Sequence, residues 1–199
     1  MTVDVNVKNA DTALLEEIDE IMEDTMVQLF ILQPRTAEAL EAAKEAAEEH
    51  APIFYCVPLS MRDEADSNCI GYYLDAADSL PVSLDQPLFV DSASLDDALS
   101  CRLREGGYRG IILDATHTHD DLENFHLSIG PGNVGTIDAE ALSKLSMDRI
   151  VLHSGYPDAG FESIYATAKR ISDTMFRPEQ SIIARATQSS LLMFGFKKG

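Results

Sequence analysis

Short apolar runs alternate with helix-like segments along most of this chain. Most of the apolar runs are continuous rather than alternating with polar residues, which is typical of parallel strands that are buried on both faces. Eight such runs are present: Thr2–Val7, Met26–Gln33, Ile53–Leu59, Cys69–Leu74, Pro87–Val90, Gly110–Leu113, Phe125–Ile129 and Arg149–Leu152. We therefore predict eight buried, parallel strands.

The segments between these runs carry helical patterns with recognisable ends. Thr36 stands before an Ala- and Glu-rich stretch, where its hydroxyl can cap the first turn. Gly106-Gly107 follows an amphipathic stretch and is a typical C-terminal cap. The predicted helices are Asp11–Asp24, Thr36–His50, Ser94–Glu105, Asp138–Leu145, Phe161–Thr174 and Pro178–Phe194.

Strands that alternate with helices to a count of eight predict a (β/α)8, or TIM, barrel. A typical barrel needs about 250 residues, whereas this chain has 199. Three connections, Ser60–Asn68, Ala76–Gln86 and Thr116–Asn124, are too short or too rich in Pro, Ser and Asp for full helices. We therefore expect one compact barrel domain over residues 1–199, with some crossover helices shortened to loops. An open, doubly wound sheet of about six or seven strands is the alternative. Length favours that alternative, and the count of eight favours the barrel.

Composition narrows the class of protein. Hydrophobic residues make up 45% of the chain, as in globular proteins. No apolar run approaches the roughly 18–20 residues of a membrane span, so we expect no membrane partner. The N-terminal residues have no basic region or signal-peptide core, which predicts a cytoplasmic location. The three cysteines are widely spaced and indicate neither a disulfide framework nor a metal site.

The net charge of −19 bears on possible partners. A strongly acidic surface repels the phosphate backbone of nucleic acids. The basic residues are scattered, and only Lys197-Lys198 at the tail are adjacent. We therefore expect a small-molecule ligand and no nucleic-acid partner, and the sequence carries no signal for an oligomeric state.

The last fifty residues carry the most specific pattern. The final strand runs into His153-Ser154-Gly155-Tyr156-Pro157, two helical segments follow, and the second closes on Met193-Phe194-Gly195. This order resembles the C-terminal end of the TatD-like metal-dependent hydrolases, a TIM-barrel branch of the amidohydrolase superfamily. There the strand ends in Leu-Glu-Thr-Asp-Ala-Pro and the Asp binds metal. The resemblance spans nearly the whole chain and implies a barrel with hydrolase chemistry at its C-terminal mouth.

At the positions that the resemblance aligns, the metal ligands of that family are replaced. The family opens with Asp-Thr-His-Cys-His-Leu, where this chain has Asp4-Val5-Asn6-Val7-Lys8. Gly71-Tyr72 stands in place of a Gly-Glu pair, and Gly155 stands in place of the metal-binding Asp. Two-metal hydrolysis needs imidazole and carboxylate ligands. We therefore expect no stable two-metal centre and at most one weakly bound divalent cation.

The replacements are polar, and they fall at the predicted C-terminal ends of strands, where barrels build their sites. The fifth and sixth strands end in Asp91 and Asp114, where the resemblance places histidines. Carboxylates and an imidazole can perform acid–base chemistry, so the catalytic candidates are Asp91, Asp114 and His153. The substrate-binding candidates are Asn6, Lys8, Asp75 and Gly132. Asp91 and Asp114 could also share a cation or bracket Lys8, and a purely structural role as loop caps or ion pairs is the alternative for both.

Two further motifs have weaker interpretations. His117-Thr118-His119 has the spacing of a metal-binding pair, but it follows the sixth strand in a segment that we interpret as a solvated loop. The segment 130–135, Gly-Pro-Gly-Asn-Val-Gly, follows the seventh strand, where many barrels bind phosphate with backbone amides. A tight turn is the alternative for this segment, and an anion bound there would also meet Lys8.

Two functions remain open from the sequence. The first is a diverged hydrolase that acts on a small substrate at the barrel mouth with Asp91, Asp114 and His153. The second is a non-catalytic relative that serves as a small-molecule or protein binding module.

Overall fold

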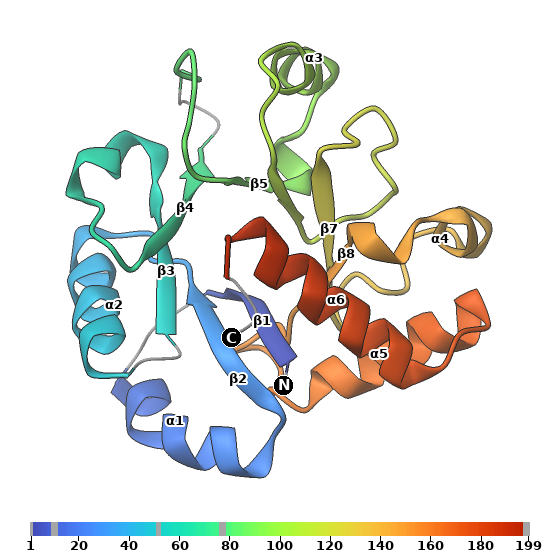
Figure 1. Cartoon of the computed structure of the whole chain (residues 1–199), viewed down its shortest axis with the longest axis horizontal. Coiled ribbons are helices and arrows are strands. Elements are labelled where there is room, and N and C mark those ends of the chain that lie inside the picture. The colour runs from blue at the N-terminus through green and yellow to red at the C-terminus, as the bar shows by residue number, and fades with distance from the viewer. Residues whose placement is uncertain (1, 9–11, 51–52, 76–78, 197–199) are drawn as a thin grey trace.

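The computed structural model describes residues 2–8, 12–50, 53–75 and 79–196. Within these residues, eight parallel strands pair in sequence order, and they curl into a nearly closed barrel with helices around it (Figure 1). The strands are β1 (Thr2–Val7), β2 (Val27–Leu32), β3 (Ile53–Pro58), β4 (Cys69–Leu74), β5 (Leu88–Asp91), β6 (Gly110–Leu113), β7 (Phe125–Ile129) and β8 (Ile150–Leu152). The predicted TIM-barrel fold is confirmed, and the open-sheet alternative is wrong.

The helices lie close to their predicted positions. They are α1 (Thr12–Asp24), α2 (Ala37–Glu49), α3 (Asp97–Glu105), α4 (Ala139–Lys144), α5 (Ser163–Met175) and α6 (Glu179–Met193). The Thr36 hydroxyl accepts the amide of Ala39 at 3.1 Å, as expected of a cap. At the end of α3, Gly107 has a left-handed backbone with φ of 66°, which glycine adopts without a steric penalty. No described helix is long and apolar enough to cross a membrane.

The expected shortening of the crossover connections is present. The connection from β3 to β4 contains only the 3-10 helix η1 (Leu59–Glu64). The connections from β4 to β5 and from β6 to β7 carry no α-helix in their described residues. Two other short 3-10 helices, η2 (Ser92–Ser94) and η3 (Met147–Arg149), precede α3 and β8.

The strands read as continuous apolar runs because both of their faces are covered. An inner cluster fills the barrel with side chains such as Val5, Ile31 and Leu113, and an outer cluster packs the strands against the helices. Neighbouring strands also approach closely at Gly110, because a Cβ there would lie 1.8 Å from the carbonyl oxygen of Leu88. Burial on both faces is the arrangement that parallel barrel strands require.

The first and last strands meet through a side chain rather than a regular ladder. The amide of Ser154, just after β8, donates to the carboxylate of Asp4 on β1 at 3.2 Å. One backbone bond follows, from the Lys8 amide to the Tyr156 carbonyl at 3.4 Å. This seam brings the C-terminal ends of β1 and β8 together.

The end of α6 covers the opposite, N-terminal end of the barrel. The Phe194 ring stacks on Phe89 with centroids 5.9 Å apart, and Phe196 lies 4.7 Å from Phe54. Phe54 and Phe89 stand near the starts of β3 and β5, and α6 crosses in front of the strands in Figure 1. The C-terminal ends of the strands therefore form the end at which a site can be built.

Candidate functional site

A chain of contacts joins three predicted site residues at the mouth. Lys8, Asp114 and His153 each follow directly after a strand, namely β1, β6 and β8. The Lys8 ammonium lies 2.9 Å from one carboxylate oxygen of Asp114, and His153 Nε2 lies 3.4 Å from the other. The Lys8 and Asp114 side chains are each 39% exposed, whereas the His153 side chain is 2% exposed. The three contacting side chains therefore extend from the solvent-exposed mouth into the barrel wall.

His153 is a buried and neutral imidazole. Burial lowers its pKa to about 4, while the nearby Asp114 acts in the opposite direction. Neither ring nitrogen has a hydrogen-bond partner among the described residues, because the contact to Asp114 lacks the required geometry. The ring lies against Gly130, where a Cβ would come within 2.3 Å of it. Gly130 therefore creates the space that His153 occupies.

The backbone beside Asp114 is held in an unusual conformation. Asp114 has φ of 49°, a left-handed value that asparagine and aspartate tolerate better than most residues. The Asn133 amide donates to the carbonyls of Ala115 and Ser128 at 2.8 and 2.9 Å, and its oxygen accepts the Gly130 amide at 2.7 Å. Asn133 thus ties the strand end that carries Asp114 to the turn that supports His153.

A second group of charged side chains, the Arg35 cluster, consists of Gln33, Arg35, Tyr73 and Asp91. The Tyr73 hydroxyl donates to the Asp91 carboxylate. The Arg35 guanidinium stacks on the Tyr73 ring with its Cζ 3.2 Å from the ring centroid. Arg35 Nη2 lies 3.3 Å from Gln33 Oε1 and 3.9 Å from Asp91 Oδ2. Burial and the hydrogen bond to Asp91 both raise the pKa of Tyr73, so it stays a donor.

The two carboxylates therefore have different cations. Lys8 contacts Asp114, as expected for one member of the pair, but Asp91 is engaged by Tyr73 and Arg35. The expectation that Asp91 and Asp114 together bracket Lys8 is not met, because Asp91 is held from the β2 and β4 side of the mouth. Sequence reasoning missed Arg35 and Tyr73. A usable signal existed for Arg35, which stands three residues after Leu32, the last residue of β2.

The seam residues Asp4 and Asn6 are fully buried. The Asp4 carboxylate accepts the amides of Asn6 and Ser154, each at 3.2 Å, and burial raises its pKa to about 6. The side-chain nitrogen and oxygen of Asn6 have no partner among the described residues. A buried amide of this kind costs free energy unless a water or ligand atom satisfies it.

Asp75 and Gly132 are both exposed, at the end of β4 and in the turn after β7. Their assignment to substrate binding stays a prediction. The amides of Asn133 and Val134 both donate to the Gly130 carbonyl, at 3.3 and 3.0 Å. Much of the turn's hydrogen-bonding capacity is thus used internally, as a tight turn requires.

The His117-Thr118-His119 motif differs from the solvated loop that we expected. His117 is exposed, but His119 is buried, and its Nε2 lies 3.2 Å from the Ser92 hydroxyl. The two imidazole rings lie against one another with centroids 3.6 Å apart. Burial lowers the pKa of His119 to about 4. Periodicity could not reveal this contact because Ser92 follows a different strand.

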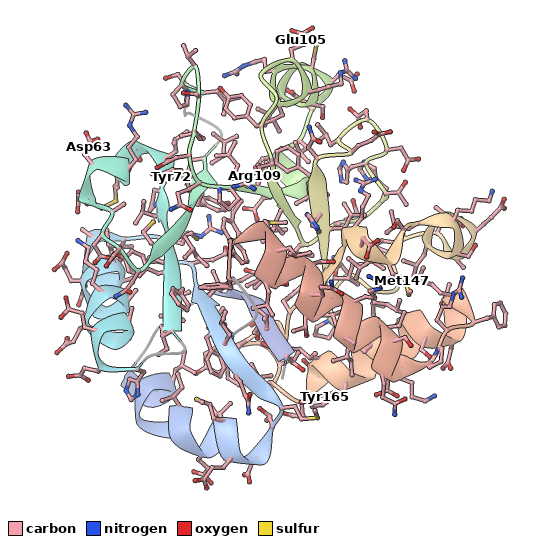
Figure 2. All side chains as sticks on the ribbon, in the orientation of Figure 1. Asp63, Tyr72, Glu105, Arg109, Met147 and Tyr165 are labelled. Atoms are coloured by element: carbon pink, nitrogen blue, oxygen red, sulfur yellow. The ribbon has the colours of Figure 1, made fainter. Side chains whose placement is uncertain are left out.

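Three of the positions that the resemblance aligns with metal ligands carry Tyr72, Gly155 and Lys8. Tyr72 on β4 (Figure 2) packs in the outer cluster, and its hydroxyl lies 3.4 Å from Asp85, so it does not face the mouth. Gly155 has a left-handed backbone and no side chain to offer. The ammonium of Lys8 already contacts the Asp114 carboxylate. Over the described parts of the chain, no three His, Cys, Asp or Glu side chains are grouped so that they could hold a metal ion.

Comparison with solved structures places the barrel among known folds. A TatD homologue of Escherichia coli K12, YjjV, is similar with a TM-score of 0.74 and 12% identity, covering 98% of both chains. A TatD family hydrolase of Entamoeba histolytica follows with a TM-score of 0.66, 10% identity and the same coverage. A 2,6-dihydroxybenzoate decarboxylase from Rhizobium has a TM-score of 0.63 and 13% identity, again covering 98% of both chains.

The resemblance to TatD-like proteins that the sequence suggests therefore holds for the fold. No protein-family profile and no curated protein matches the chain.

Proposed function

We propose that this protein is a diverged TatD-like hydrolase that acts on a small molecule at the C-terminal mouth of its barrel, without a resident two-metal centre. One observation carries the proposal. Lys8, Asp114 and His153 form a continuous chain of contacts at three strand ends, which is where TIM barrels hold their catalytic groups.

The chemistry of the three side chains suits metal-independent hydrolysis. His153 is neutral and buried, so it can accept a proton from an attacking water, with Asp114 stabilising the imidazolium that forms. The Lys8 ammonium can stabilise negative charge that develops on a substrate oxygen. In this proposal Asp91 is the second carboxylate of the mouth, and Asn6, Lys8, Asp75 and Gly132 contact the substrate. At most one divalent cation binds weakly at the mouth, and the proposed chemistry does not depend on it.

Hydrolysis of p-nitrophenyl acetate and p-nitrophenyl phosphate by EDTA-treated protein tests the proposal. Asp114→Asn and His153→Gln should each lower kcat by about 10²–10⁴, the range for loss of an acid–base group. Asp63→Asn is the matched control, because the Asp63 side chain is 98% exposed on η1. Activity that EDTA abolishes and zinc restores, or activity that both mouth variants retain, would count against the proposal.

The alternative is a non-catalytic barrel that serves as a small-molecule or protein binding module. Its support is the pairing of each mouth carboxylate with a cation, which leaves Asp91 and Asp114 engaged in contacts within the protein. In that case neither ester is hydrolysed, while a ligand of the mouth still raises the melting temperature.

A further inference from the structure

We infer that the Arg35 cluster is a binding subsite for a planar carboxylate, so that the small molecule taken up at the mouth carries a carboxylate group. The inference rests on the proposed function and specifies the substrate class for the same mouth. The inference is carried by the geometry of Arg35. Its guanidinium is held by the Tyr73 ring on one face and by Gln33 at one nitrogen, and its side chain is partly exposed to solvent.

The guanidinium plane is held by two neighbours. One face stacks on the Tyr73 ring at 3.2 Å, a cation–π contact. Nη2 donates to Gln33 Oε1 at 3.3 Å, and Gln33 is itself buried and donates from Nε2 to the Val5 carbonyl at 3.3 Å. Because the orientation is fixed before a ligand arrives, binding costs less side-chain entropy than it would for a freely moving arginine.

The remaining donors of Arg35 are available. A guanidinium carries five N–H donors. The contacts to Gln33 and Asp91 are both made by Nη2, and Arg35 also hydrogen-bonds the Tyr73 side chain. The Arg35 side chain is 36% exposed. The N–H donors that Gln33 and Tyr73 do not use can therefore meet a ligand that approaches from the mouth.

Asp91 does not use these donors. Its distance of 3.9 Å to Nη2 exceeds hydrogen-bond range, because its carboxylate accepts the Tyr73 hydroxyl instead. Tyr73 thus acts as a positioning residue that keeps Asp91 from closing on the guanidinium. An unpaired Asp91 would form a bidentate pair with Arg35 and exclude the ligand.

The charge at the mouth favours a monoanion with two coplanar oxygens. Lys8 and Arg35 offset the charges of Asp114 and Asp91, so these two carboxylates repel an anion less than the net charge of −19 would suggest. A carboxylate matches one edge of the guanidinium fork. A phosphate dianion favours a second cation beside the guanidinium, whereas Lys8, the other cation of the mouth, contacts Asp114 rather than a residue of the Arg35 cluster.

The test is calorimetric titration with benzoate, with benzamide as the neutral isostere and inorganic phosphate as the competing anion. Wild-type protein should bind benzoate at least about tenfold more tightly than either probe, since an arginine–carboxylate fork is stronger than neutral hydrogen bonds. Arg35→Gln should lose at least about tenfold in benzoate affinity, and Arg35→Lys should lose much of it, because lysine lacks the planar fork. Arg62→Gln, at a half-exposed arginine on η1, is the control and should bind as wild type does.

A second set of variants distinguishes carboxylate binding by the Arg35 cluster from a purely structural role in which the cluster only holds neighbouring strands together. Tyr73→Phe keeps the stacked ring but frees Asp91 to compete for Arg35, so benzoate affinity should fall about threefold or more. Adding Asp91→Asn should restore it. A purely structural role predicts changes in melting temperature, but no loss of benzoate affinity in Tyr73→Phe and no recovery when Asp91→Asn is added.

The inference is overturned if wild-type protein gives no saturable response to benzoate, if benzamide binds as well, or if Arg35→Lys and Tyr73→Phe bind as wild type does. Because binding is measured without turnover, its outcome is separate from that of the hydrolysis assay. Benzoate binding without hydrolysis of either ester retains this subsite and removes the proposed activity. Hydrolysis of an ester without benzoate binding retains the proposed activity and removes this subsite.

Discussion

At the seam of the barrel, Asp4 keeps a carboxyl group fully buried between β1 and β8. Burial raises its pKa from 3.8 to about 6, and this outweighs the hydrogen bonds from the Ser154 side chain and from the Asn6 and Ser154 amides, which favour the charged form. The folded protein therefore holds this proton more tightly than the unfolded chain does. Stability from this group is fully present at low pH and is lost as the pH rises from about 4 to 6.

Asp4→Asn should remove this loss. A shift of about two pKa units corresponds to about 3 kcal/mol, so the stability of the variant relative to wild type should improve by about that amount between pH 4 and pH 7. Urea unfolding at both pH values measures the change, and any constant effect of the lost hydrogen bond cancels in the difference. A wild-type-minus-variant difference that is the same at both pH values would contradict the assignment.

Lys8 is expected to contribute to stability through Asp114. Because both side chains are 39% exposed, Lys8→Ala should lower the unfolding free energy by only about 1 kcal/mol at pH 7. The loss in melting temperature should be smaller at pH 4, where carboxylates begin to protonate and where His153, whose pKa Lys8 holds down, gains its proton more easily. Lys169→Ala, in an exposed helical pair with Asp173, serves as the control. Equal losses at both pH values would show that the Lys8 contact does not matter.

Among the secondary-structure elements, α6 has the clearest structural role, because the turn that follows it covers the N-terminal end of the barrel. Met193 belongs to the inner cluster, and Phe194 and Phe196 pack on rings of β5 and β3. The inner cluster would otherwise be open to water at that end. The candidate site thus lies at the C-terminal ends of the strands, and the packing that closes the barrel lies at their N-terminal ends, as is usual in TIM barrels.

Phe194→Ala should therefore destabilise the fold by about 2 kcal/mol, somewhat less than a fully buried phenylalanine because Phe194 is only partly buried. Leu192→Ala on the same helix is the control, since Leu192 is 68% exposed and should lose little. Chemical denaturation of both variants measures the difference. Equal losses would mean that the ring of Phe194 does not seal the barrel.

For the molecule as a whole, two buried histidines and one half-buried histidine should dominate the response to acid. Burial lowers the pKa values of His119, His126 and His153 to about 4. Between pH 6.5 and 4 the unfolded chain therefore binds more protons than the folded protein, so stability falls as the pH falls through this window, opposing the contribution of Asp4. The midpoint of urea unfolding should decrease on acidification, and His126→Gln should reduce the slope. A midpoint that rises on acidification would contradict this balance.

The net charge of −19 belongs to the whole surface and sets the expectation for nucleic acids. We expect no measurable DNA binding at physiological salt, where non-specific binders reach dissociation constants of about 10⁻⁴–10⁻⁶ M. Fluorescence anisotropy with a labelled duplex at several salt concentrations measures this. Salt-sensitive binding tighter than roughly 1 µM would contradict the prediction and point to a basic patch that the sequence does not reveal.

The sequence determined the elements of this protein and their order. The runs Thr2–Val7, Cys69–Leu74, Gly110–Leu113 and Phe125–Ile129 coincide with β1, β4, β6 and β7, because strands buried on both faces are mostly apolar. The sequence also indicated that Lys8 would contact an aspartate of the mouth. Strand order alone brings such residues to one end of a parallel barrel.

Only the tertiary structure decided which side chains meet. The pairing of β3 with β4 shifts from Tyr55↔Cys69 to Cys56↔Gly71, and the extra residue in β4 changes the facing of the residues after it. Tyr73 therefore joins the inner cluster and Asp91, while Tyr72, at the aligned ligand position, faces outward. A strand that is apolar on both faces carries no alternation from which the inward side can be deduced. The register between β3 and β4 decides which side chains face inward, and the contacts of Arg35 decide which of them meet. Neither is a local property of the sequence.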